Sequence, residues 1–168
     1  MEKTVGKQSI RFEEAIHLIS AASIAGKKEG EGPLGKLFDK ISADPCFGME
    51  TWEKAETAMQ KLALSSALDK AGLSASALDY ILAGDLLNQC IGSGFAVRGQ
   101  DVPFFGLYGA CSTMAESLSL AALLLDGGFA THAAAMTSSH FCSAARQYRP
   151  PPAYGGQRTP HPQRQGAG

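Results

Sequence analysis

The chain has 168 residues, of which 45% are hydrophobic and 18% are charged, and its formal net charge is −1 at pH 7. This composition is that of one globular domain with a core, and it excludes a disordered chain. A net charge so close to zero gives no electrostatic indication of a nucleic-acid or anionic-membrane partner.

Targeting signals and cysteines bear on where the protein works. Residues 1–14, MEKTVGKQSIRFEE, are polar and charged, so we expect no signal peptide. The longest apolar run, residues 118–125, is shorter than the roughly 18 residues of a membrane-spanning helix. The four cysteines are widely spaced and form no CxxC pair, which gives no indication of a zinc site or a redox dithiol. We expect free thiols, no metal site and a reducing, cytoplasmic compartment.

The first half of the chain contains one clear helix. Residues 15–19, AIHLI, can form a strand, and residues 26–35, GKKEGEGPLG, are typical of a loop. Residues 51–71 carry apolar side chains at helical spacing, which predicts a helix with Thr51 as its N-cap and Gly72 just after its end. The expected polar face consists of Glu53, Lys54, Glu56 and Lys61.

Three short apolar runs follow, separated by helical or polar segments. The predicted strands lie within residues 78–85, 102–109 and 132–137. Strands that alternate with helices are typical of a layered α/β sheet, in which ligands bind beyond the carboxyl ends of the strands. Asp85, Cys111 and His140 follow these runs. Because polar residues occur wherever a strand meets a loop, the placement fits a binding site and fits an ordinary sheet.

Residues 114–125 are apolar on nearly all sides, which predicts a helix buried in the middle of the domain. Thr113 and Glu116 have the spacing of a capping box, and the glycine pair at 127–128 is expected to end the helix. Cys111 then lies at the helix start, where the backbone N–H groups favour a thiolate or a bound carboxylate. The thiol can be a nucleophile or part of an anion site, and it can equally be a small apolar filler.

Six segments, in chain order, closely resemble one known family. They are EGPLGKLFDK, YILAGDLLNQ, FFGLYGACSTMAES, LLLDGGFA, TSSH and ARQYR with the YGGQ that follows it. They resemble the stage V sporulation protein AD family of the thiolase-like superfamily, and the resemblance runs from about residue 6 to residue 157.

The resemblance implies an α/β thiolase-like fold, in which two similar halves with layered sheets pack around two buried helices. Cys111 in GACST matches the active-site cysteine of thiolases, at the start of the buried helix of the first half. The family is implied to bind dipicolinic acid, or its calcium complex, and to help move it into the developing spore. Its implied partners include membrane proteins of the same uptake system, and its implied location is the cytoplasm or forespore, at the inner spore membrane. A dimer is compatible with the full-length family.

The chain also departs from the family pattern. Thiolases take a histidine and a second cysteine from a second half, which this sequence does not contain. After YGGQ the family continues into a strand rich in Thr and Gly, whereas residues 158–168, RTPHPQRQGAG, lack apolar alternation. We therefore expect residues 1–157 to form the first thiolase-like half without its last strand, and residues 158–168 to be a disordered tail outside the family. A truncated or frame-shifted gene, or an early stop, would explain this pattern.

Dipicolinate is an aromatic ring with two carboxylates, and its chemistry selects candidate ligands. Carboxylates are bound by N–H donors and by arginine, aromatic rings pack on flat side chains, and calcium prefers oxygen. The expected binding residues are Cys111, Ser112, Thr113 and His140 as donors, Arg146 and Arg149 as carboxylate partners, Phe105 or Tyr108 as the wall, and Asp85 and Asn88 as oxygen ligands for calcium or water.

Two alternatives belong to other functional classes. In an acyltransferase, the Cys111 thiolate attacks a thioester and backbone N–H groups hold the oxyanion. The missing histidine and second cysteine argue against turnover by this chain. In the other alternative, the polypeptide is an inactive fragment that exposes the apolar face normally covered by the other half.

Overall fold

The computed structural model describes residues 3–139 of the chain. The expected last-strand region and the expected tail at 158–168 lie outside these residues. The strands are β1 (Thr4–Val5), β2 (Ser9–Ile10), β3 (Ile24–Gly26), β4 (Lys40–Ser42), β5 (Tyr80–Gly84), β6 (Phe104–Gly106) and β7 (Ala133–Thr137). The α-helices are α1 (Lys27–Gly30), α2 (Trp52–Ala71), α3 (Ile91–Val97) and α4 (Thr113–Asp126).

A three-stranded parallel sheet in the order β6-β5-β7 forms the centre of the fold. The middle strand β5 pairs Ile81 with Phe104 of β6 and with Ala134 of β7. Its sequence YILAG is apolar throughout, as expected of a parallel strand that is covered on both faces. The three strands predicted from the second half of the chain are confirmed, and so is the α/β class.

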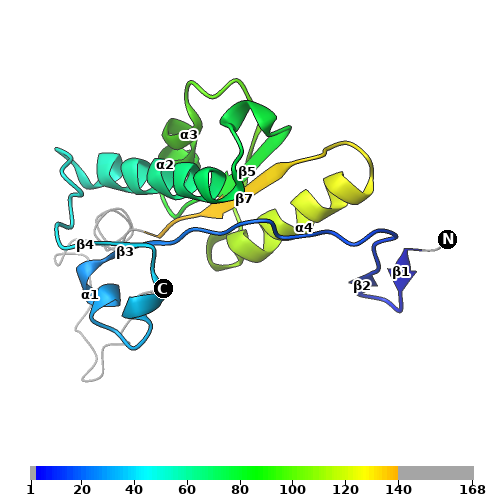
Figure 1. The fold of residues 1–168 in the computed structure, drawn as a ribbon, viewed down its shortest axis with the longest axis horizontal. Coiled ribbons are helices and arrows are strands. Elements are labelled where there is room, and N and C mark those ends of the chain that lie inside the picture. The colour runs from blue at the N-terminus through cyan, green and yellow to red at the C-terminus, as the bar shows by residue number, and fades with distance from the viewer. Residues whose placement is uncertain (1–2, 140–168) are drawn as a thin grey trace, which may run out of the picture.

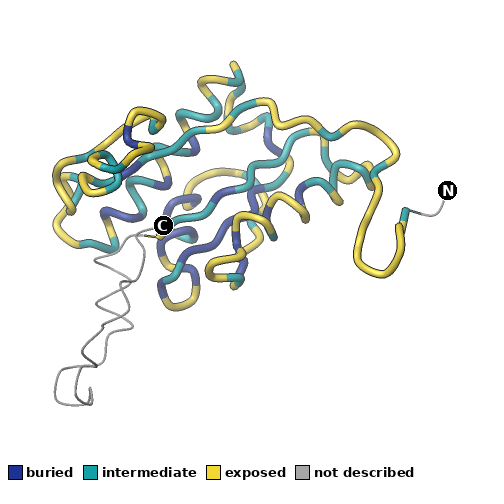
Figure 2. Tube along the Cα trace, turned by 90° about the horizontal axis from the view of Figure 1, so that it is seen from below, coloured by how far each residue is buried: buried dark blue, intermediate teal, exposed yellow. Residues whose placement is uncertain are grey.

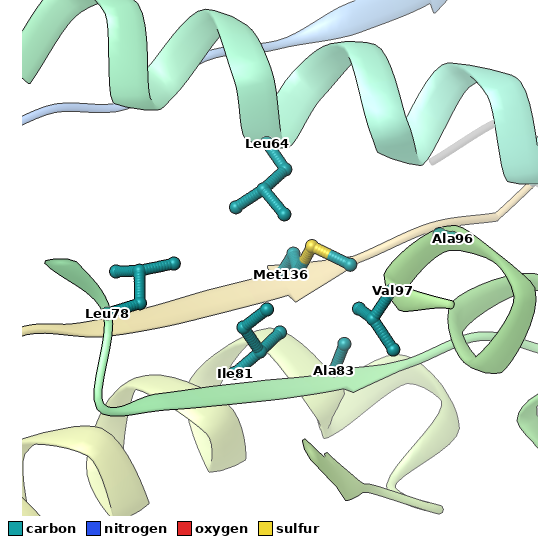
Figure 3. Packing of buried hydrophobic residues seen from close by; sticks show 7 residues of the cluster. All are labelled: Leu64, Leu78, Ile81, Ala83, Ala96, Val97 and Met136. Atoms are coloured by element: carbon teal, nitrogen blue, oxygen red, sulfur yellow. The ribbon is translucent and has the colours of Figure 1, made fainter. Parts of the chain in front are cut away.

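Helices cover the two faces of this sheet separately. Figure 1 shows α2 and α4 on opposite sides of β5 and β7. Because side chains alternate along a strand, Ile81 and Ala83 face α2 and α3, and Leu82 faces α4. Figure 3 shows the cluster on the first face, in which Leu64 of α2 points toward Met136 of β7. Its buried members are Leu64, Leu78, Ile81, Ala83, Ala96, Val97 and Met136.

Helix α2 has the ends that its sequence predicts. The Thr51 side chain accepts a hydrogen bond from the Lys54 N–H at 3.2 Å, and Gly72 adopts the left-handed conformation, with φ of 66°, just after the last turn. The predicted polar face is wrong at Glu56, which is only 1% exposed. Glu56 lies four residues before Gln60 and eight before Leu64, on the stripe that faces the sheet.

Helix α4 begins two residues after Cys111, as predicted, and the chain turns at Gly127 and Gly128. The capping-box prediction is wrong, because the helix start has no side-chain cap and the Thr113 hydroxyl has no hydrogen-bond partner among the described residues. The prediction that this helix is buried all round is also wrong for the described residues. Only Thr113, Ser117 and Ala121 are buried, on one stripe toward the sheet, while the opposite side is exposed.

The N-terminal region forms an extended arm rather than a layer of the sheet. Figure 2 shows the β1–β2 hairpin near the N-terminus as exposed. Residues 15–19, where a strand was predicted, have no regular structure, and the predicted loop at 26–35 contains the short helix α1. Strands β3 and β4 pair in parallel as a separate two-stranded sheet. Apolar content alone did not make residues 15–19 a strand, because they pair with no other strand of the described part of the chain.

Candidate functional site

A hollow lies beyond the carboxyl ends of β5 and β6, where α/β sheets commonly bind ligands. We call it the strand-end pocket. Its volume is about 440 Å³, within the range of small-molecule sites. Its lining residues are Asp85, Leu86, Leu87, Asn88, Gln89, Tyr108 and Ala110.

Asp85 shapes this pocket by holding its own loop. One carboxylate oxygen accepts a hydrogen bond from the Leu87 N–H at 2.8 Å. The other oxygen accepts from the Ser93 N–H at 2.7 Å and from the Ser93 hydroxyl at 2.6 Å. Ser93 is in the first turn of α3, so the carboxylate also satisfies one of the N–H groups left open at that helix start. Both oxygens are therefore committed to the protein itself.

A buried polar network continues from Asp85 to the end of β7. The Gln60 side-chain NH₂ donates to the Ser93 hydroxyl at 3.2 Å and to the Ser138 hydroxyl at 2.5 Å. Ser138 in turn donates to the Glu56 carboxylate at 2.6 Å. The network thus joins α2, α3 and the ends of β5 and β7 through side chains that are mostly inaccessible to water.

Three residues beside the pocket have backbone conformations that side chains disfavour. Gln89, Cys90 and Ala110 have φ angles of 57°, 51° and 48°, although none is glycine. Each such conformation costs roughly 1–3 kcal/mol and persists only where surrounding contacts impose it. Gln89 and Ala110 line the pocket from opposite loops. Strain of this kind is common at functional sites.

The Cys90 thiol is buried beneath the pocket. Its sulfur donates to the Leu107 carbonyl oxygen at 3.2 Å, and burial raises the pKa of the thiol above its ordinary value. A raised pKa lowers the thiolate fraction at neutral pH, so Cys90 behaves as a packing residue. Its neighbour Gly84 must be a glycine, because a Cβ there would lie 2.2 Å from the same Leu107 oxygen.

Cys111 is exposed, on the 3-10 turn (Ala110–Ser112) that leads into α4. It follows the pocket residue Ala110 but is not among the lining residues. Ser112 is exposed, and its hydroxyl donates to the Gly109 carbonyl oxygen at 2.8 Å. Thr113 is fully buried. The sulfur is therefore not an apolar filler of the core.

A carboxylate of this chain also lies near the α4 start. A Cβ built on Gly109 would lie 2.3 Å from a Glu116 carboxylate oxygen, so the Glu116 side chain reaches back over the 3-10 turn. An anionic ligand at the helix start would meet this negative charge, which disfavours a second anion there.

The structure brings only some of the predicted site residues together. Asp85, Asn88 and Tyr108 line one pocket, and Cys111, Ser112 and Thr113 follow its wall at Ala110. His140, Arg146 and Arg149 lie outside the described residues. Within residues 3–139, no cluster of three His, Cys, Asp or Glu side chains is arranged to hold a metal ion.

A second hollow, of about 680 Å³, lies elsewhere, between α2 and the residues that follow α3. It is lined by side chains such as Leu62, Leu68 and Arg98, and it contains none of the predicted site residues. Although it is the larger of the two, it is at neither the sheet's carboxyl edge nor the strained loops. We place the candidate site at the strand-end pocket.

Glu56, Gln60 and Ser93 were not predicted as site residues. One signal in the sequence could have identified the first two. The spacing of four from Glu56 to Gln60 continues through Leu64 and Leu68, so two polar residues occupy the apolar stripe of a helix. Polar residues on such a stripe are buried and need partners.

Comparison with known proteins agrees with the segments noted in the sequence. The chain matches the family described as Stage V sporulation protein AD (SpoVAD) over residues 6–168. It is 45% identical, over 156 residues, to "Stage V sporulation protein AD" of Bacillus subtilis (strain 168). That match covers 93% of this chain and 46% of the relative, so the chain spans about half the length of the protein it matches.

A solved structure is also similar in part. It is 3-oxoacyl-[acyl-carrier-protein] synthase III from Aquifex aeolicus VF5, with a TM-score of 0.44 and 24% sequence identity, covering 51% of this chain and 30% of the synthase. None of the helices within residues 3–139 is long and apolar enough to cross a membrane. The match over nearly the whole chain settles the family: the protein belongs to the stage V sporulation protein AD family.

Proposed function

We propose that this protein binds dipicolinate, free or with calcium, during its uptake into the developing spore. The proposal is supported by membership of a sporulation family together with a pocket at the carboxyl edge of the sheet. A volume of about 440 Å³ is ample for a small aromatic dicarboxylate. The exposed ring of Tyr108 at the pocket offers a flat surface for the pyridine ring.

Among the described residues, the charge of the pocket lining favours the calcium complex over the free dianion. Asp85 is the charged residue of the seven described lining residues, and its negative charge repels a free dicarboxylate. A bound cation removes that repulsion. Arg146 and Arg149 remain the proposed partners of the ligand carboxylates.

Isothermal calorimetry tests the proposal. Dipicolinate is titrated into the chain with and without calcium, and picolinate, which has one carboxylate, serves as the control ligand. We expect saturable heat below millimolar concentration, stronger with calcium. Tyr108→Leu should weaken binding about three- to tenfold, whereas Phe129→Leu, which removes an equally exposed ring at a distant position, should not. No heat with either form of the ligand would contradict the proposal.

The proposed partners are proteins of the same uptake system, including its membrane components, and the proposed location is the forespore side of the inner spore membrane. Co-purification of the tagged protein with forespore membranes, and its loss from them when the other components are deleted, tests this part. A tagged protein that remains unassociated would contradict it.

An acyltransfer activity at Cys111 is the alternative, and the exposure of its sulfur beside the α4 start favours it. The thiolate would attack a thioester carbonyl, release the coenzyme thiol and carry the acyl group. A thiol-release assay with acetyl-CoA, with Cys111→Ser as control, distinguishes the two functions. Turnover that depends on Cys111 would favour the transferase.

A further inference from the structure

We propose that Gln60 is a positioning residue that fixes the shape of the strand-end pocket from outside it. The inference rests on the proposed function, because the shape of the pocket matters only if the pocket binds a ligand. The experiment that tests the inference needs no ligand. Gln60 is 3% exposed and is not among the lining residues, so it acts through other groups.

Two carboxylates, which can only accept hydrogen bonds, lie at the ends of the network, and they fix which group donates in every hydrogen bond between them. The hydroxyl protons of Ser93 and Ser138 both point to carboxylates, on Asp85 and Glu56 respectively. Each hydroxyl oxygen can therefore only accept from the side chain between them. An amide NH₂ has two protons to give, one for each serine, and Gln60 gives both. No other uncharged side chain of this length supplies two such donors.

The network leads to the pocket through one continuous path. Gln60 orients Ser93, Ser93 holds one oxygen of Asp85, and the other oxygen of Asp85 holds the Leu87 N–H. Asp85 and Leu87 are both lining residues. In the other direction, Ser138 follows β7, and its N–H donates to the Gly84 carbonyl oxygen at 3.2 Å. The same glutamine thus joins the end of β7 to the end of β5, and the residues that follow β5 line the pocket.

Close packing makes this arrangement rigid. A Cβ built on Gly92 would lie 3.3 Å from the Asp85 carboxylate and 3.4 Å from the Gln60 side-chain nitrogen. The backbone of α3 therefore lies close to both side chains. Within residues 3–139 the Gln60 side-chain oxygen has no hydrogen-bond partner, a cost that an apolar residue would avoid. The buried Gln60 amide is costly for stability, and the orientation of the Ser93 and Ser138 hydroxyls by its NH₂ explains why a polar side chain is present there.

Amide hydrogen exchange on the 168-residue chain tests this inference without any ligand. Gln60→Met keeps the length of the side chain but removes the NH₂. We expect the Leu87 and Ser93 amides to exchange about tenfold faster relative to the Ile81 amide, which reports the central sheet. Leu64→Val, one turn further along the same stripe, is the matched control, and it should change all three amides by the same factor. An unchanged ratio of Leu87 to Ile81 exchange in Gln60→Met would overturn the inference.

Ser138→Ala is the second variant, and it keeps the test decisive if Gln60→Met does not fold. It cuts the network at the β7 end only, and we expect the Leu87 amide to accelerate about threefold, although the side-chain path from Ser138 to Asp85 runs through Gln60 and Ser93. No acceleration there would equally overturn the inference. Calorimetry with calcium and dipicolinate then separates the two proposals. If the unmodified chain binds no dipicolinate, the proposed function fails while the exchange ratios still decide the role of Gln60.

Discussion

The two faces of the central sheet differ in how completely the described residues cover them. On the face toward α2 and α3, Ile81 and Ala83 are fully buried in a cluster that draws on both helices and β7. On the face toward α4, the buried cluster is only Leu82, Leu107 and Ala121. The outer side of α4 carries large apolar side chains that are exposed, at Met114, Leu118, Leu120 and Leu123.

The face toward α2 and α3 is thus covered within the described residues, whereas the face toward α4 is covered by a helix that itself leaves apolar surface exposed. An amphipathic helix has one apolar stripe, and α2 buries its own against the sheet. Helix α4 is apolar on both sides, so burial of one stripe still leaves apolar surface in water. The polar network lies on the covered face, where water is excluded and each hydrogen bond is stronger.

The largest expected effect compares neighbouring residues of β5 on the two faces. Ile81→Ala should lower the free energy of unfolding by about 3–5 kcal/mol, because the surrounding cluster cannot collapse into the cavity. Leu82→Ala should cost less, about 2–3 kcal/mol, since α4 is held by a smaller cluster and can shift. Urea denaturation followed by circular dichroism measures both. A larger loss of unfolding free energy for Leu82→Ala than for Ile81→Ala would show that the face toward α4 is the better packed one.

A smaller effect concerns the starts of the two long helices. Thr51→Ala removes the hydrogen bond to the Lys54 N–H and should cost about 1 kcal/mol, while Thr51→Ser, which keeps the hydroxyl, should cost little. Ser112→Ala should cost less than Thr51→Ala, because the Ser112 side chain does not cap α4. The same denaturation experiment measures all three variants. Equal losses for Thr51→Ala and Ser112→Ala would contradict this assignment.

A local, pH-dependent effect concerns the attachment of the N-terminal arm to the end of α4. The Lys3 ammonium group donates to Asp126 at 2.7 Å and lowers the pKa of that carboxyl, with help from the Glu13 N–H. A lowered pKa means that this stabilisation is present above the ordinary value and is lost as the pH falls through the lowered one.

We therefore expect the Glu13 amide to lose protection in acid before the central sheet unfolds, as measured by hydrogen exchange between pH 5 and pH 2, that is, roughly across the titration of an aspartate. Asp126→Asn, which removes the titrating carboxyl, should abolish this acid-specific loss. An arm that stays protected in acid in the unmodified chain would show that the ion pair does not hold it.

The smallest expected effect on stability is on the outer side of α4. Leu118→Gln should change the free energy of unfolding by less than about 0.5 kcal/mol, because Leu118 is already exposed. It should nevertheless reduce self-association of the chain, which analytical ultracentrifugation measures, since exposed apolar patches associate. Lys61→Gln, an exposed change on α2, is the control. A monomeric unmodified chain would remove the contrast between the two faces.

The sequence predicted the regular elements of the second half and missed what tertiary contacts decide. The spacing of apolar residues located α2, β5, β7 and α4, and Thr51 and Gly72 marked the two ends of α2, because those signals are local. The buried positions of Glu56 and Gln60 could not be read from their polarity, since Ser93 and Ser138 are their partners only in the folded chain. The exposure of α4 was missed for the same reason. Its apolar composition says that it can be buried, and only the fold shows which side is covered.

The strand-end rule selected Asp85, Cys111 and His140 as the candidate site. Asp85 lines the strand-end pocket, Cys111 follows its wall residue Ala110, and His140 lies outside the described residues. The strand-end rule could not show that the two Asp85 carboxylate oxygens accept hydrogen bonds from the Leu87 and Ser93 N–H groups. Those hydrogen bonds depend on the turn that follows β5. The backbone strain at Ala110 was equally invisible in the sequence.

Backbone NMR of the isotope-labelled chain, during a titration with calcium and dipicolinate, tests the proposal that dipicolinate occupies the strand-end pocket. We expect saturable shifts confined to the amides of the pocket loops, with Gln89 and Ala110 among the largest, and unchanged signals around the second hollow at Leu68. Shifts centred on that hollow, or no shifts at millimolar ligand, would overturn the proposal.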